Sequence, residues 1–243
     1  MLPSQELKRI AQGIGFSAIG VVGNCRFASL PVGPVEDAAT LASPESVLGT
    51  AKSMIVLGFR IWDSSFNLAA VRSADLGGSN FHQLYAEVAA AKAWEVAHYL
   101  WSLGHEAIVT RAVCLKRAAV LAGIGAQGKN TVIVSPRHGE SLRFAAVLTA
   151  AEFEEDPAFA GDLCGDCSKC IDACPTKALG PRGIDIKRCM VYSVEHPQSA
   201  DVASDVRAAE ARFIKRSTEN SFIECTICLS ACPVGKRYSE TYI

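Results

Sequence analysis

The sequence contains no run of about 18 uninterrupted apolar residues, the length that a membrane-spanning helix requires. Its first 15 residues lack the basic start, the long apolar stretch and the small-residue cleavage site of a secretory signal, and they contain no twin arginine. We therefore expect no membrane partner and a cytoplasmic location. A reducing cytoplasm leaves thiols free to bind metals instead of forming disulfides.

Neither sign of charge is in large excess: the chain has 24 lysine and arginine residues and 25 aspartate and glutamate residues, which gives a net charge of −1. The field of the whole chain therefore does not attract nucleic acid. The histidines show no spacing typical of a metal site. With 49% hydrophobic residues among 243, the composition is that of a globular protein with one large or two modest domains.

Cysteine is abundant, and eight of the ten cysteines fall into one pattern. The first run has the form C-x2-C-x2-C-x3-C-P, as in bacterial two-cluster ferredoxins, and the second run repeats it with its first cysteine far upstream. Cys25 and Cys114 lie outside the pattern and are expected to be small buried side chains. We predict two four-iron, four-sulfur clusters with eight ligands: Cys164, Cys167, Cys170 and Cys174 in the first run, and Cys189, Cys225, Cys228 and Cys232 in the second.

The spacing also predicts how these ligands divide. Three closely spaced thiolates can surround one face of a cluster, whereas the fourth position opens a short helix that leads to the other cluster. One cluster is therefore expected to bind Cys164, Cys167, Cys170 and Cys232, and the other to bind Cys189, Cys225, Cys228 and Cys174. Two zinc sites with four cysteines each are the alternative, because they also use C-x2-C pairs. Zinc requires neither the third cysteine nor the C-x3-C-P ending, so iron–sulfur clusters are favoured.

The rest of the chain alternates helical and extended patterns. Helical spacing of apolar residues, a proline at a first helical position and a terminal glycine predict helices, at 4–15, from 43–45, at 81–103 and at 113–121. Continuous apolar runs predict strands, at 16–22, 53–61, 106–109, 131–135 and 142–149. This interleaving predicts an α/β or α+β layer. The acidic run 152–157 is interpreted as a linker between predicted domains at residues 1–155 and 156–243.

A glycine-rich segment, 123–130, lies between a predicted helix and a predicted strand. It matches G-x-G-x-x-G by letter, and it misses a Walker A loop by one residue because Asn130 stands where Ser or Thr would bind magnesium. Phosphate-binding loops, however, leave a strand and open a helix. The residues alone therefore favour a tight turn in which Gly123, Gly125 and Gly128 supply positive φ or close backbone approach, with Lys129 solvated.

Several segments, in this order, resemble the epoxyqueuosine reductase family, which is related to the reductive dehalogenases. The resemblance covers nearly the whole chain and rests on these segments, followed by the two cysteine runs: Leu7–Val22, Ala51–Leu57, Gly78–His82, Ala122–Thr131 and Ser135–Arg137. It implies a nitroreductase-like, cobalamin-binding α/β domain followed by a bacterial-ferredoxin-like two-cluster domain.

The same resemblance implies an activity. In that family, electrons pass from an external low-potential donor through the two [4Fe-4S] clusters to the cobalt of a corrinoid, and the namesake enzyme removes the epoxide oxygen from a modified tRNA base. The turn residues Gly123, Gly125, Gly128, Lys129 and Asn130 would then pass close to the cobalamin. A tRNA partner gains no support from the charge balance of this chain.

One departure from the family concerns the proton donor. Members with the namesake activity carry an aspartate in a Val-Asp-Ser-Ala-Pro-like stretch ahead of the glycine turn, whereas the corresponding region here, 107–115, has no carboxylate and Glu106 lies at its edge. Opening an epoxide requires a proton source within hydrogen-bond reach. The catalytic residues therefore stay unassigned.

Three hypotheses follow from the scaffold and from this departure. The first is a cobalamin-dependent iron–sulfur reductase with an altered substrate. The second is a non-catalytic two-cluster electron-transfer protein that serves a corrinoid or a protein partner. The third is epoxyqueuosine reduction with another proton source, which the missing aspartate disfavours.

Overall fold

The computed structural model describes residues 1–33, 41–61, 84–181, 183–216 and 222–234. Contacts between residues divide the chain into two compact units. Unit 1 comprises residues 1–60, 86–126 and 141–161, and unit 2 comprises residues 61–85, 127–140 and 162–243. The domain boundary near residue 155 stays a prediction, and by these contacts the segment 127–140 groups with the cysteine runs.

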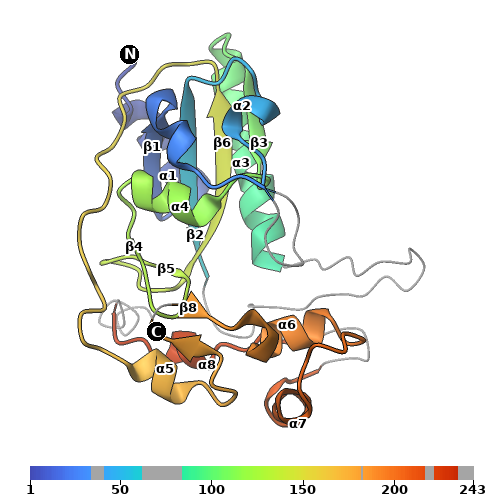
Figure 1. Cartoon of the computed structure of the whole chain (residues 1–243). Helices are drawn as coiled ribbons and strands as arrows, with labels where there is room; N and C mark the ends of the chain where they lie inside the picture. The colour runs from blue at the N-terminus through green and yellow to red at the C-terminus, as the bar shows by residue number, and fades with distance from the viewer. Residues whose placement is uncertain (34–40, 62–83, 182, 217–221, 235–243) are drawn as a thin grey trace. The chain divides into compact units, whose positions relative to one another are not determined.

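Unit 1 is built on a four-stranded antiparallel sheet with the strand order β1-β2-β6-β3 (Figure 1). Its strands are β1 (Ala18–Gly23), β2 (Ser53–Arg60), β3 (Ala107–Thr110) and β6 (Leu142–Thr149). β2 and β6 pair along their whole length, from Ser53 opposite Thr149 to Arg60 opposite Leu142. Seven of the eight residues of β2 are buried, as expected of a central strand that is covered on both faces.

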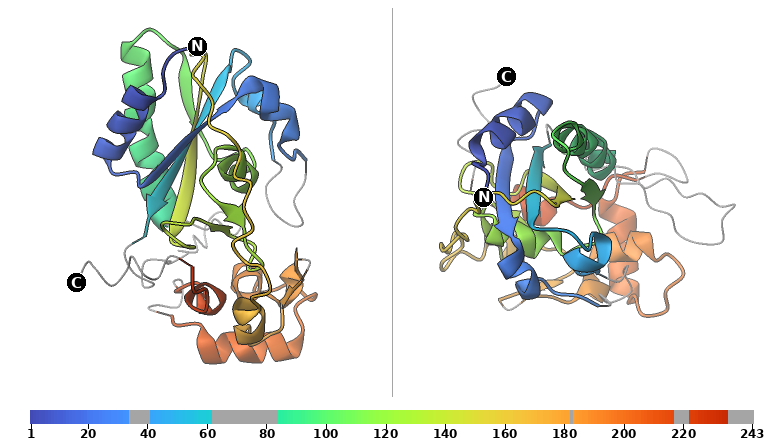
Figure 2. Two further views of the ribbon diagram at one scale, coloured as in Figure 1. Left: turned by 90° about the vertical axis from the view of Figure 1, so that its left-hand side faces the viewer. Right: turned by 90° about the horizontal axis from the view of Figure 1, so that it is seen from above.

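Helices cover both faces of this sheet. α1 (Gln5–Ile14) and α3 (Leu84–Ser102) lie on one side, and α4 (Leu115–Leu121) lies on the other (Figure 2). The short α2 (Pro44–Val47) and the 3-10 helix η1 (Asn24–Ser29) complete the described elements of the unit. The predicted mixed α/β fold is therefore confirmed. None of the helices among the described residues is long and apolar enough to cross a membrane.

The acidic run 152–157 is fixed to unit 1, so its interpretation as a linker is wrong. The Asp156 carboxylate accepts a hydrogen bond from the Val21 backbone N–H at 2.8 Å and a second from Lys8 Nζ at 2.6 Å, and the Asp156 N–H donates to the Val21 carbonyl. Arg26 binds the neighbouring Glu155 carboxylate at 2.9 Å. Since β1 is an edge strand, the run pairs backbone groups that would otherwise be left without partners in the sheet.

A close approach between β1 and the end of α4 requires glycine at position 20. A Cβ atom at Gly20 would overlap the carbonyl oxygen of Ala122 and lie 2.8 Å from the Ala122 Cβ. Gly13, inside α1, is the opposite case, since a Cβ there would meet nothing within 4 Å. The two glycines thus have different physical reasons to be present.

We expect Gly20→Ala to destabilise the protein by about 1–3 kcal/mol, because the added methyl overpacks a backbone contact. Gly13→Ala should stabilise it by about 0.5–1 kcal/mol, because alanine loses less entropy in a helix. Thermal unfolding of the two variants and the parent protein measures both effects. Equal unfolding temperatures for the two variants would contradict the close contact at Gly20.

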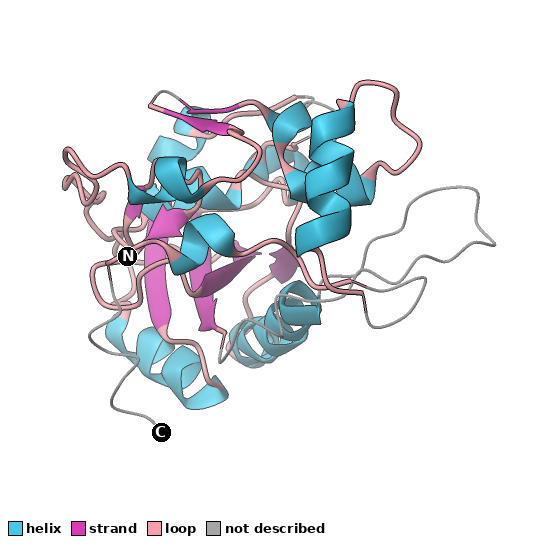
Figure 3. Cartoon of the chain, turned by 90° about the horizontal axis from the view of Figure 1, so that it is seen from below, coloured by secondary structure: helices cyan, strands magenta, loops and turns pink. Residues whose placement is uncertain are grey.

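The described part of unit 2 consists of short helices and two-residue strands joined by loops (Figure 3). β5 (Ile133–Val134) pairs with β4 (Ala126–Gln127), and β7 (Leu179–Gly180) pairs with β8 (Gly183–Ile184). Its helices are α5 (Lys169–Ala173), η4 (Ile186–Arg188), α6 (Met190–Glu195), α7 (Ser204–Phe213) and α8 (Ile227–Ser230). α5 packs against α8, and α6 packs against α7.

Most predicted elements are present, with shifted ends. The strand expected at 142–149 has those bounds, whereas the strand expected at 131–135 shortens to β5 because Thr131 has a positive φ of 66°. The helix expected at 81–103 is α3, which is described from Leu84. The segment Gly78–His82, which contributed to the family resemblance, lies outside the described residues.

Candidate iron–sulfur site

Two short helices place the cysteines of the two runs. α5 contains Cys170 and ends just before Cys174, and α8 contains Cys228 and ends two residues before Cys232. A short helix therefore precedes the fourth cysteine of each run, so the prediction that the fourth position opens a helix is wrong. Because α5 and α8 pack against each other, the two runs meet within unit 2.

Four of the eight cysteines share one small core. Cys170 and Cys174 are each 9% exposed and pack with Ala178 and Leu179. Cys189 and Cys228, from the second run, pack against the same core. Thiols from both runs thus lie next to one another, which suits the passage of electrons between two centres.

Most of these thiols have electrostatic neighbours from their own predicted group of four, and Cys228 is an exception. Burial, followed by Cys164, raises the pKa of the Cys170 thiol, and burial followed by Glu140, Cys164 and Cys170 raises that of Cys232. In the other predicted group, burial followed by Cys189 and Cys174 raises the pKa of Cys225. The division into four and four and the assignment of individual ligands stay predictions.

Cys228 shows the strongest effect among the described thiols. Burial, followed by Cys225, Cys189, Cys174 and also Cys170 of the other predicted group, raises its pKa to about 12. Without a metal this thiol keeps its proton at neutral pH, and metal binding must displace that proton. No three His, Cys, Asp or Glu side chains in the described ranges lie close enough to share a single metal ion. Thiolates around a four-iron cluster are held apart by the cluster itself.

Cys174 is shifted in the opposite direction. Burial alone would raise the pKa of its thiol, but hydrogen bonds lower it. The Thr176 hydroxyl lies 3.6 Å from its Sγ, and the Ala178 backbone N–H donates to the same sulfur at 3.3 Å. Donors to cluster sulfurs influence reduction potentials. The sequence pattern did not single out Thr176, which is 3% exposed.

The loop that opens the first run is held from two sides. The Asp162 carboxylate accepts hydrogen bonds from the N–H groups of Cys164 at 2.8 Å and Gly165 at 3.2 Å. Lys129 Nζ donates to the carbonyl oxygens of Gly165 at 2.7 Å and Cys167 at 3.1 Å. The expectation that Lys129 is merely solvated is therefore wrong. The contacts of Asp162 have a local signal in the sequence, because aspartate often caps the N–H groups two and three residues onward, whereas those of Lys129 have none.

Packing within the chain accounts for two of the turn glycines. Gly123 has a φ of 73°, and a Cβ there would lie 2.6 Å from the Pro157 carbonyl oxygen. A Cβ at Gly128 would lie 2.5 Å from Asn130 Oδ1 and 2.7 Å from a methyl of Val134. Gly125 is buried. The missing side chains of Gly123 and Gly128 thus leave room for neighbouring atoms of the chain.

Asn130 remains unexplained by packing. It is only 4% exposed, and its Oδ1 has no hydrogen-bond partner in the part of the chain that the structure describes. Buried polar atoms are almost always paired with protein, water or ligand. This oxygen is therefore left for a water or a ligand to pair.

The region that should carry the family's aspartate forms β3 and the start of α4. At its edge, the Glu106 carboxylate accepts a hydrogen bond from the Thr50 hydroxyl at 2.5 Å. Arg111, inside the region, pairs with Glu87 of α3 at 2.9 Å. Cys114 is half-buried, and Cys25 is exposed, so the expectation of two buried thiols is wrong for Cys25. No residue of 107–115 supplies a carboxylate.

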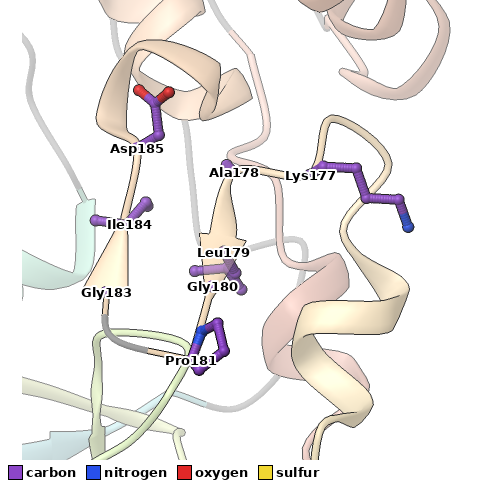
Figure 4. A pocket seen from close by; sticks show the side chains of 8 residues that line it. All are labelled: Lys177, Ala178, Leu179, Gly180, Pro181, Gly183, Ile184 and Asp185. Carbon is purple, nitrogen blue, oxygen red and sulfur yellow. The ribbon is translucent and has the colours of Figure 1, made fainter.

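A shallow hollow of about 570 Å³ adjoins the cysteine core (Figure 4). The strands β7 and β8 line it, together with Lys177, Ala178 and Asp185. Ala178 links the hollow to the core, because its N–H donates to Cys174 Sγ. Lys177 and Asp185 are charged, and the other six lining residues are glycines or apolar residues.

A comparison with known families defines the class of protein. Residues 163–235 match the 4Fe-4S double cluster binding domain. The chain is therefore an iron–sulfur protein with a double-cluster domain, and the predicted pair of [4Fe-4S] clusters is confirmed at this level.

Comparisons over the whole length are more specific, and they show similarity to epoxyqueuosine reductases. The chain is 28% identical to that of Synechococcus sp. (strain CC9605), over 96% of this chain and 76% of the relative. It is 27% identical to that of Bacillus subtilis (strain 168), over 96% of this chain and 63% of the relative. The predicted family resemblance is confirmed.

Solved structures of these proteins share the fold. An epoxyqueuosine reductase from Bacillus subtilis, whose catalytic aspartate loop is swung out of the active site, aligns with a TM-score of 0.71 at 20% identity. A second, with an epoxyqueuosine-modified tRNA stem loop, gives 0.67 at 21%. Each alignment covers 96% of this chain but 65% of the other. A reductive dehalogenase gives 0.62 at 15%, over 96% of this chain and 33% of the other.

The division of ligands predicts which substitution removes which cluster. Cys170→Ala should damage the cluster of Cys164, Cys167 and Cys232, whereas Cys174→Ala should damage the other, because each loses one of four ligands. Cys25→Ala is the control and should keep both clusters. Iron analysis and EPR after anaerobic reconstitution distinguish these outcomes, and loss of the same cluster in both variants would refute the division.

Glu195, at the end of α6, offers a test of burial beside the second cysteine group. Burial raises the pKa of its carboxyl from 4.5. As the pH rises above 4.5, the Glu195 carboxyl therefore loses its proton in the unfolded chain before it does so in the folded protein. The free energy of unfolding then falls until the pH has passed the raised pKa of the folded state. We expect Glu195→Gln to raise the unfolding temperature at pH 7, with a gain that shrinks towards pH 4.5.

The matched control for Glu195 is Glu210→Gln. Glu210 is paired with Arg216 at 2.8 Å and with Arg207 at 3.3 Å, and its side chain is 12% exposed. Removing this paired charge should lower the unfolding temperature at pH 7. An equal change in both glutamine variants would show that burial of Glu195 has no specific effect.

Proposed function

We propose that this protein passes electrons from an external low-potential donor through two [4Fe-4S] clusters to a bound cobalamin, which serves a reductive reaction. The observation that carries the proposal is the shared core of Cys170, Cys174, Cys189 and Cys228. Because thiols of both runs pack there, the two clusters would lie side by side. Electrons could then cross between them without leaving unit 2.

Residues of the glycine turn fit a corrinoid in one respect. The amide groups at the periphery of a corrinoid are hydrogen-bond donors, and the buried Oδ1 of Asn130 is an acceptor that no described residue satisfies. When bound, the corrinoid supplies a cobalt centre that accepts electrons and reduces a substrate. Gly123, Gly125 and Gly128 would shape the turn, while Lys129 binds the carbonyls of the first cysteine loop.

The substrate is proposed to differ from epoxyqueuosine. The Bacillus subtilis relative has a catalytic aspartate loop, whereas residues 107–115 of this chain contain no carboxylate and Glu106 is bound to Thr50. A reaction that does not need a strong acid at this place fits the chain better. The same observation favours, as a second candidate, a two-cluster electron carrier that transforms no substrate itself.

Anaerobic reconstitution with iron, sulfide and hydroxocobalamin tests the proposal. After desalting, we expect about eight irons and one cobalt per chain, together with the EPR signal of a bound corrinoid. Asn130→Ala should keep the iron and weaken corrinoid binding about 2- to 12-fold, the worth of one net hydrogen bond of about 0.5–1.5 kcal/mol. Eight irons without cobalt would contradict the cobalamin proposal and leave the electron carrier.

A tRNA substrate is the subject of a separate assay. The relative solved with an epoxyqueuosine-modified tRNA stem loop shows which probe to use. We expect the reconstituted protein to leave such a stem loop unchanged in the presence of a chemical reductant. Conversion of the epoxide would contradict the altered substrate and would require a proton source other than a carboxylate within 107–115.

A further inference from the structure

We propose that Lys129 is a positioning residue for the cluster expected at Cys164, Cys167, Cys170 and Cys232, and that its charge makes this cluster easier to reduce. The inference rests on the double-cluster domain and not on the binding of cobalamin. It gives the glycine turn a second role, because the turn then supports the cluster loop directly.

The contacts of Lys129 are specific to the loop that carries the first two ligands. Its Nζ donates to the carbonyl of Gly165, between these ligands, and to the carbonyl of Cys167 itself. All of these residues lie in unit 2. The lysine therefore reaches from the turn to the ligand loop within one compact unit.

Three backbone N–H groups of the same loop have partners close by in the sequence. Asp162 accepts the N–H groups of Cys164 and Gly165, and the Cys167 N–H donates to the Cys164 carbonyl at 2.9 Å. Gly165 adopts a positive φ of 47°, which suits glycine. The N–H groups and carbonyls of Cys164, Gly165 and Cys167 are thus all paired, which restricts the loop that carries the two thiols.

The charge of Lys129 adds an electrostatic effect to this support. Reduction adds one electron from an external donor to the cluster, and no bond to a ligand breaks. A fixed positive charge stabilises the added negative charge, so it favours the reduced cluster. Asp162 interacts with Lys129, and its negative charge acts in the opposite direction.

Three substitutions separate support from charge. Lys129→Gln keeps a hydrogen-bond donor and removes the positive charge, whereas Lys129→Arg keeps both. Asp162→Asn removes the negative charge and keeps an acceptor oxygen for the N–H groups of the loop. Each protein is reconstituted with iron and sulfide alone, and both clusters are titrated anaerobically with a chemical reductant and followed by EPR. Iron content shows that the clusters are complete.

In Lys129→Gln we expect one cluster to become about tenfold harder to reduce, a shift of about 59 mV for one electron, while the other stays unchanged. Lys129→Arg should match the parent protein, and Asp162→Asn should shift the same cluster a few-fold towards easier reduction. Unchanged potentials in Lys129→Gln at full iron content would overturn the proposal. If Lys129→Gln does not bind the full amount of iron, Asp162→Asn becomes the test. An unchanged reduction potential in that variant would then overturn the electrostatic effect.

Discussion

The structure of unit 2 depends on cysteine side chains that pack into its small cores. Its hydrophobic cores are small: one consists of Cys170, Cys174, Ala178 and Leu179, and another of Met190, Val194, Ile214 and Phe222. Cores of this size contribute little stability, and small domains of this kind gain it from metals. Burial also raises the pKa of most of these thiols, so metal binding and deprotonation are coupled. We therefore expect the folding of this unit to be coupled to the binding of its clusters.

Unit 1 has the opposite character. Its central strand β2 is buried along nearly all its length, and helices cover both faces of the sheet. The edge strand β1 is closed by the acidic run through Asp156, while Gly20 lets the end of α4 approach. Apolar packing of this kind is the main source of stability for unit 1.

The sequence predicts what depends on local patterns. The strand 142–149 follows from an apolar run, and the short helix that begins at Pro44 follows from the position of the proline. Contacts between distant segments were not predictable in this way. The sequence of 152–157 is typical of a linker, and its pairing with β1 becomes visible only in the fold. Likewise, the sequence around Lys129 gives no sign of its contact with the carbonyl of Gly165. The buried Oδ1 of Asn130 also has no counterpart in a sequence pattern.

The most direct test of the central claim is a crystal structure of the anaerobically reconstituted protein, with anomalous scattering recorded at the iron edge. The account predicts two separate iron peaks, each of four irons. One should be surrounded by Cys164, Cys167, Cys170 and Cys232, and the other by Cys189, Cys225, Cys228 and Cys174. A single iron cluster, or a cluster whose ligands mix the two groups, would contradict it.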